Sequence, residues 1–75
     1  MCHPARQIAL RHKAELRRRL HALTQRLSVN DPDELADQLV LLIDGAYVNG
    51  QLRGKRGPVQ ALPTAATVLI EAASA

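Results

Sequence analysis

The feature that most constrains the fold is residues 31–53, which carry apolar side chains on two sides of a predicted helix. The two stripes are Leu35, Leu39, Leu42 and Ala46, and Ala36, Val40, Ile43, Tyr47 and Gly50. A helix on the surface of a protein needs one apolar stripe, so a helix with two is expected to be buried on several sides. A chain of 75 residues covers only part of that surface from within. We therefore expect a second molecule to cover the rest.

The start of this helix has a clear signal. Asp31 suits the N-cap, Pro32 suits the first helical position, and Glu34 stands three residues after the cap. Gly54 and Gly57 are typical of the chain just beyond a helix end. Gly45 and Gly50, inside the helix, cost stability relative to Ala, and close approach of another backbone would compensate.

Two further helices are predicted. Residues 4–27 place Leu16, Leu20, Leu23 and Leu27 on one helix face. Residues 61–73 are rich in Ala and nearly uncharged, and Pro63 fits their first turn if a looser turn precedes residue 61. The short loops favour antiparallel neighbours. We predict a single all-α domain over residues 1–75, with three antiparallel helices at about 4–27, 31–53 and 61–73.

The chain offers few groups for chemistry. Cys2 is its only cysteine, so no internal disulfide forms. His3, His12 and His21 are nine residues apart, so successive ones point to opposite sides of one helix. We expect surface histidines, no metal, no cofactor and no enzymatic activity. The acidic residues after position 30 are interpreted as helix-capping and dipole-complementing groups, while Asp44 is either at the edge of a buried face or paired across an interface.

Charge and hydropathy indicate the compartment and the alternative partners. The sequence has neither an apolar leader nor a membrane-length apolar run, so we expect a cytoplasmic protein with no membrane partner. Residues 1–29 carry seven Lys or Arg and one Glu, whereas the remainder is net acidic. An alternative function is therefore non-specific nucleic-acid binding through residues 6–26. In a helical hairpin, Arg19 or Arg26 would instead approach Glu34 or Asp37.

Two stretches resemble a known family. Residues 3–6 (HPAR) lead into 10–16 (LRHKAEL), and residues 31–46 read DPDELADQLVLLIDGA. Over residues 3–57 the chain resembles the C-terminal part of TetR-family (tetracycline-repressor-like) transcriptional regulators. That resemblance implies a fragment of an effector-binding domain that lacks the DNA-binding helix-turn-helix and does not bind an operator by itself. Effector and operator DNA would be partners of the full-length protein only.

The resemblance also implies a homodimer in which the last two helices form an intermolecular four-helix bundle. The apolar positions of those helices are expected to contribute to the core and the dimer interface, in a division that the sequence leaves open. They are Leu35, Leu39, Leu42, Ile43, Ala46, Tyr47, Gly50, Leu62, Ala66, Leu69 and Ile70. Candidate ligand-pocket residues are His12 and Tyr47, although Tyr47 also suits a core position.

Overall fold

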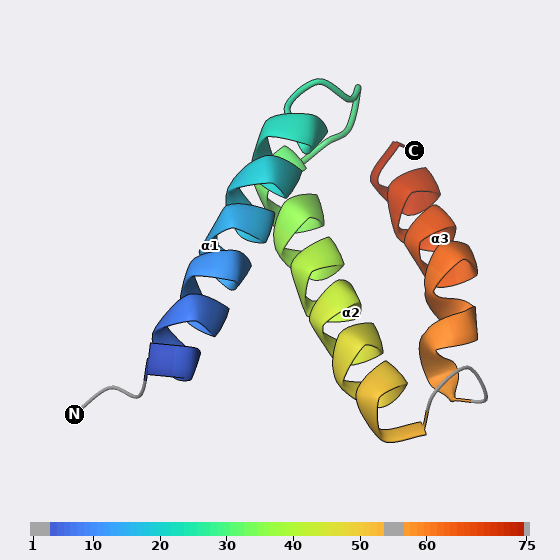
Figure 1. Ribbon diagram of the computed structural model, residues 1–75. Helices are drawn as coiled ribbons and strands as arrows, with labels where there is room; N and C mark the ends of the chain where they lie inside the picture. Colours follow the sequence, from blue (N-terminus) through green and yellow to red (C-terminus); the bar gives the residue numbers. More distant parts are fainter. Residues whose placement is uncertain (1–3, 54–56, 75) are drawn as a thin grey trace.

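The computed structural model describes residues 4–53 and 57–74, and these residues form helices without strands. Helix α1 spans Pro4–Thr24, α2 spans Pro32–Arg53, and α3 spans Leu62–Ser74, preceded by the 3₁₀ turn η2 at Pro58–Ala61. The all-helical class and the three helices agree with the prediction. In Figure 1 the chain rises along α1, turns over, descends along α2 and returns along α3.

The helix boundaries follow local chemistry. The amide of Glu34 donates to Asp31 Oδ1 at 3.1 Å, and the amide of Leu35 donates to the Asp31 carbonyl oxygen at 3.1 Å, so Asp31 is the N-cap of α2. Helix α3 begins after η2, and Pro63 is its second residue, where its missing N–H costs no hydrogen bond. Cys2, His3 and Gly54 lie outside the described residues.

Helix α1 ends at Thr24, so the predicted end at residue 27 was wrong. The amides of Arg26 and Leu27 donate to carbonyl oxygens three residues earlier, at Leu23 and Thr24, with N–O distances of 3.0 Å. This hydrogen-bond pattern tightens the last turn into a 3₁₀ conformation, which ends the α-helix before the turn at residues 28–30.

The helices form one layer with α2 in the middle (Figure 1). Helix α2 packs against α1 on one side and against α3 and η2 on the other, and no Cα atom of α1 lies within 8 Å of α3. The molecule measures 43 × 30 × 14 Å, and its shortest extent is little more than the roughly 10–12 Å diameter of a single helix. Its radius of gyration is 13.9 Å, against about 11 Å for a compact domain of this length.

The core is small and is formed by residues at the end of α1 and near the start of α2. Leu35 and Ala36 are at most 1% exposed, Leu39 is 8% exposed, and the Thr24 side chain is buried beside them. The Thr24 hydroxyl donates to the His21 carbonyl oxygen at 3.2 Å, so its polar group is satisfied. The amide of Asn30 donates to the Ala73 carbonyl oxygen at 2.9 Å and joins the turn after α1 to the end of α3.

Candidate interaction site

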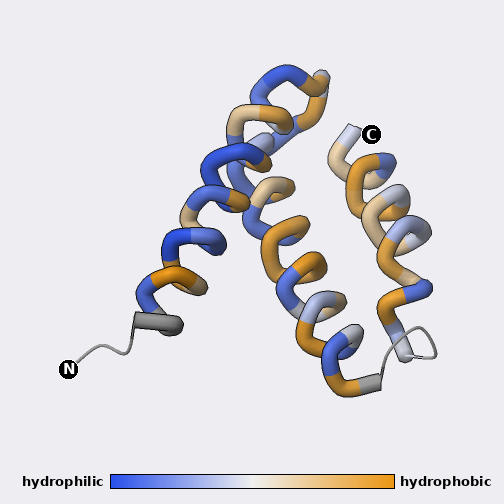
Figure 2. The backbone as a smooth tube through the Cα atoms, in the orientation of Figure 1, coloured by the Kyte–Doolittle hydropathy of each residue, from blue (hydrophilic) through white to orange (hydrophobic). Residues whose placement is uncertain are grey.

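The structure divides the predicted core and interface residues between the interior and the surface. Leu35 and Leu39 lie in the core of the single chain. Tyr47 is 67% exposed. The other members are half-buried: Leu42, Ile43, Ala46, Gly50, Leu62, Ala66, Leu69 and Ile70. Figure 2 shows the apolar colouring along α2 and α3 beyond the small core.

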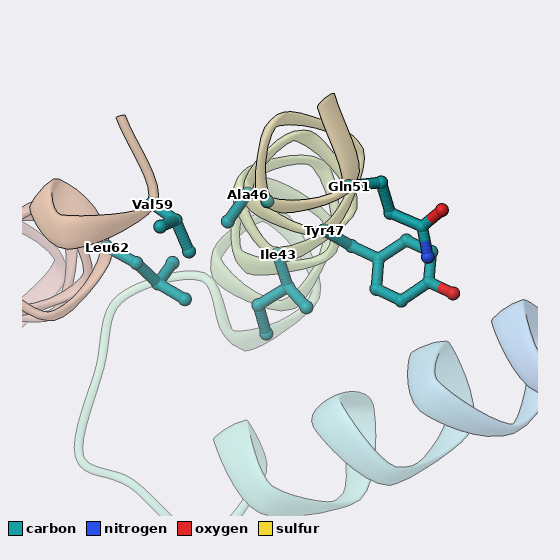
Figure 3. Close-up of a pocket in the computed structure, with 7 residues that line it drawn as sticks. Ile43, Ala46, Tyr47, Gln51, Val59 and Leu62 are labelled. Atoms are coloured by element: carbon teal, nitrogen blue, oxygen red, sulfur yellow. The ribbon is translucent and has the colours of Figure 1, made fainter. Parts of the chain in front are cut away.

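An open trough runs between α2 and the start of α3. It has a volume of about 570 Å³ and is lined by Ile43, Ala46, Tyr47, Gly50, Gln51, Val59 and Leu62. Figure 3 shows Ile43 and Leu62 pointing into the same space, while the Tyr47 ring projects toward the other side of α2. Most of these residues come from the predicted interface set, so the structure gathers them on one exposed surface rather than in a closed core.

A second groove, of about 240 Å³, separates the first half of α1 from α2. Its lining brings together His12 and Tyr47, the two residues predicted to face a ligand pocket. Asp44 is half-buried in the same groove, which Lys13 also lines, so Asp44 lies at the boundary of an apolar face inside one chain. The remaining lining residues are Ala9, Leu16 and Ile43.

A polar clamp joins the end of α1 to the start of α2. It consists of Arg17 and His21 from α1, Gln25 directly after α1, and Asp33 and Asp37 from α2. His21 Nδ1 lies 3.1 Å from Asp33 Oδ1, and its Nε2 lies 3.0 Å from Asp37 Oδ1. Arg17 Nε donates to Asp37 Oδ1 at 3.3 Å, and Gln25 Nε2 donates to Asp33 Oδ1 at 2.9 Å. Only a protonated imidazole donates from both nitrogens, so the clamp favours charged His21.

The clamp changes the acidity of its members. Hydrogen bonds to Asp37 and then Asp33 raise the pKa of His21 above its ordinary value of 6.5. The same His21 contact, together with Arg17, lowers the pKa of Asp37 below 3.8. The sequence predicted surface histidines, and His21 keeps a side chain that is 26% exposed, but it did not predict that two carboxylates would hold this side chain. The available signal was the spacing of Asp33 and Asp37, which places two carboxylates one helical turn apart on α2.

We expect the clamp to make stability depend on pH. A raised His21 pKa contributes stability that is complete below the unfolded pKa and is lost as pH rises through the folded pKa. The lowered Asp37 pKa contributes stability above its unfolded value that is lost as pH falls through the folded value. The melting temperature should therefore fall as pH rises from about 6.5, the pKa of histidine in the unfolded chain, through the higher folded-state pKa of His21. His21→Gln should flatten this slope in a circular-dichroism series, whereas His12→Gln should keep it; equal slopes in all three proteins would contradict the clamp.

Arg18 and Arg19 bind a carboxylate of their own helix. Arg18 Nη2 lies 2.6 Å and Arg19 Nε 2.9 Å from Glu15 Oε1, and the pKa of Glu15 is lowered by Arg18 first and Arg19 second. The expectation that Arg19 reaches α2 was wrong, because Glu15 lies one turn away and Arg17 takes the Asp37 contact. Within residues 6–26, the segment considered for nucleic-acid binding, Arg17, Arg18 and Arg19 therefore have acidic partners in the chain.

The structure also exposes apolar residues that the sequence analysis did not select. Leu41 is 74% exposed, Val48 53% and Leu52 78%. Their signal was available: with Gly45 they recur at steps of four, three and four, which defines a third stripe on α2. A Cβ added at Gly45 or Gly50 would meet no atom within 4 Å, so within residues 4–53 and 57–74 no other segment approaches either glycine closely.

No family model, curated protein or solved structure matches the chain. In the part of the chain that the structure describes, no three His, Cys, Asp or Glu residues form a group that could hold a metal ion. Across residues 4–53 and 57–74, no helix combines the length and apolarity that crossing a bilayer requires. The interaction surfaces are thus the features on which a functional proposal rests.

Proposed function

We propose that this chain is a homodimerisation module, forming part of the effector-binding domain of a TetR-like transcriptional regulator. In this module, α2 and α3 of one copy would pack antiparallel to each other and against the same pair of helices in a partner, giving a four-helix bundle. The regulator assignment rests on the sequence resemblance over residues 3–57. The dimer assignment rests on the surface that one chain leaves exposed.

The exposed area is the observation that carries the dimer. The chain exposes 5973 Å², whereas a compact protein of 8.2 kDa exposes about 4,500 Å². The excess of roughly 1,400 Å² is larger than the approximately 800 Å² that each partner buries in a standard interface, so the chain has enough excess surface for one. Stable folds bury the apolar faces of their elements between layers, and this chain supplies one layer. A second copy would supply the other.

In the full-length regulator, the groove between α1 and α2 would contribute part of the pocket for a small-molecule effector. His12 and Tyr47 line that groove. Helix-turn-helix heads outside this module would bind operator DNA in the cytoplasm, and the dimer would couple effector binding to their spacing. Nucleic-acid binding through residues 6–26 is the weaker alternative, because Arg17, Arg18 and Arg19 all lie against carboxylates.

The dimer is tested by light scattering coupled to size exclusion. At micromolar concentrations we expect twice the chain mass of 8.2 kDa, together with a helical circular-dichroism spectrum. A folded, stable monomer in this range would contradict the dimer. The regulator assignment has a separate test, which is to read the coding sequence upstream of Met1 for an in-frame helix-turn-helix. If no helix-turn-helix is encoded there, the proposal of a TetR-like regulator is contradicted, whereas the proposal of a dimer is not affected.

A further inference from the structure

Asp44 is a half-buried acidic residue of α2 that lines the groove between α1 and α2. Among residues 4–53 and 57–74, no hydrogen bond or ion pair joins its carboxylate to another residue. Glu15 and Asp37, in contrast, each lie against an arginine. A charge taken partly out of water without a partner is unfavourable. A cation that enters the groove therefore gains a contact that the chain itself does not supply.

The walls of this groove and its size indicate an organic cation with a small apolar part. Ala9 and Leu16 form one wall on α1, and Ile43 contributes to the other on α2. The volume of about 240 Å³ lies below the roughly 300–1,000 Å³ of pockets that take drug-sized ligands. The groove therefore suits one ring and a short alkyl chain, whose apolar surface is removed from water against these walls.

Tyr47 adds an aromatic ring beside the carboxylate. It follows Asp44 by three residues, so the two side chains lie on the same face of α2. Figure 3 shows the ring on the side of α2 that is nearer to α1. An ammonium group is attracted to the face of a tyrosine ring as well as to a carboxylate. A cation in the groove therefore meets two attractive groups one helical turn apart.

The basic residues of the groove favour an anionic ligand less strongly than Asp44 favours a cation. Of the polar residues that line the groove in the described part of the chain, Asp44 is half-buried, whereas His12, Lys13 and Tyr47 are exposed. Ion pairs with exposed side chains contribute little, because water and salt screen them. The most enclosed charge of the groove, which is negative, therefore decides the sign of the ligand.

We infer that the groove between α1 and α2 binds amphipathic organic cations, in which a short alkyl chain joins an aromatic ring to an ammonium group. The ammonium group would lie between the Asp44 carboxylate and the Tyr47 ring, and the apolar part against Leu16 and Ile43. The inference rests on the proposed function, in which this groove is part of the effector pocket, and it names the chemical class of the effector. The proposed bundle pairs α2 and α3 with a partner, so α1 and its wall of the groove lie outside that bundle.

The test titrates the chain with two probes that have the same apolar body and opposite charges, 4-phenylbutylammonium and 4-phenylbutyrate. Tyr47 is the only tyrosine in a chain without tryptophan or phenylalanine, so its fluorescence reports on this groove. For the ammonium probe we expect a saturable change with a dissociation constant on the order of 1 mM, as suits a small ligand in an open groove. The butyrate probe should bind at least about tenfold more weakly.

Three variants separate the groove from the overall charge of the chain. Asp44→Asn keeps the Tyr47 reporter and should weaken binding of the ammonium probe at least about tenfold. Glu71→Gln is the matched control, because it removes the same charge from an exposed position of α3 outside the groove; it should bind the probe like the parent chain. Lys13→Gln removes a like charge from the groove and should strengthen binding about twofold.

Three results would overturn the inference: no saturable binding of the ammonium probe, equal binding of the two probes, or equal weakening by Asp44→Asn and Glu71→Gln. If Asp44→Asn loses its helical circular-dichroism signal, the comparison of the two probes on the parent chain decides. A dimeric chain that prefers the butyrate probe would contradict only the ligand class. A monomeric chain that prefers the ammonium probe would contradict the proposed dimer and keep the cation site.

Discussion

Leu35→Ala is expected to lower the free energy of unfolding by about 2–5 kcal/mol, the usual cost of removing a buried leucine side chain. Leu35 is 1% exposed and is the largest fully buried residue of a very small core. A single core in a chain of this size supplies about 3–5 kcal/mol of net stability at most, so the variant should be largely unfolded at room temperature. Urea titration followed by circular dichroism measures the change.

The matched control for this cavity is Leu23→Ala, since Leu23 is 55% exposed on α1. It should change the free energy of unfolding by less than about 0.5 kcal/mol, as surface substitutions usually do. All proteins must be compared at one protomer concentration, because association adds to apparent stability. If Leu35→Ala and Leu23→Ala lower the free energy of unfolding equally, the packing around Leu35 is not the core of the molecule.

Asp31→Ala is expected to lower the free energy of unfolding by about 0.5–2 kcal/mol, because it removes a helix cap. The Asp31 carboxylate accepts the amide of Glu34 at 3.1 Å, and alanine leaves that amide without this acceptor. Asp31→Asn keeps an oxygen at the same place without the charge, so it should retain most of the stability. If Asp31→Asn lowers the free energy of unfolding as much as Asp31→Ala does, the effect belongs to the negative charge at the helix N-terminus and not to the hydrogen bond.

The helices of this protein could be predicted closely because their signals are local. The N-cap of α2 is encoded within four residues, Asp31 to Glu34, and the structure shows the hydrogen bond that the pattern predicts. The late start of α3 followed from the fixed φ of Pro63 and its missing N–H. The end of α1 was missed because Arg26 and Leu27 bond three residues back, a choice between two similar helical geometries that the sequence signals weakly.

The division of α2 between core and surface could not be predicted in the same way. Periodicity fixes the angle of each residue around the helix, but the positions of α1 and α3 decide which angles are covered. The structure covers Leu35 and Leu39 and leaves Leu41 exposed, although all three are leucines of one helix. His21 was missed for a related reason, since its partners Asp33 and Asp37 belong to the next helix and are reached only after the chain turns back.

The flatness of the helical layer has a thermodynamic consequence. Unfolding raises the heat capacity in proportion to the apolar surface newly exposed to water, typically by about 12–15 cal/mol/K per residue in compact domains. In a folded chain only 14 Å thick, much of that apolar surface is already exposed to water before unfolding. Calorimetry of an isolated protomer should give a smaller heat-capacity change per residue on unfolding and a broad endotherm. In the proposed dimer, the heat-capacity change per residue should rise toward the value of compact domains, and the rise would measure the apolar area buried between the two copies.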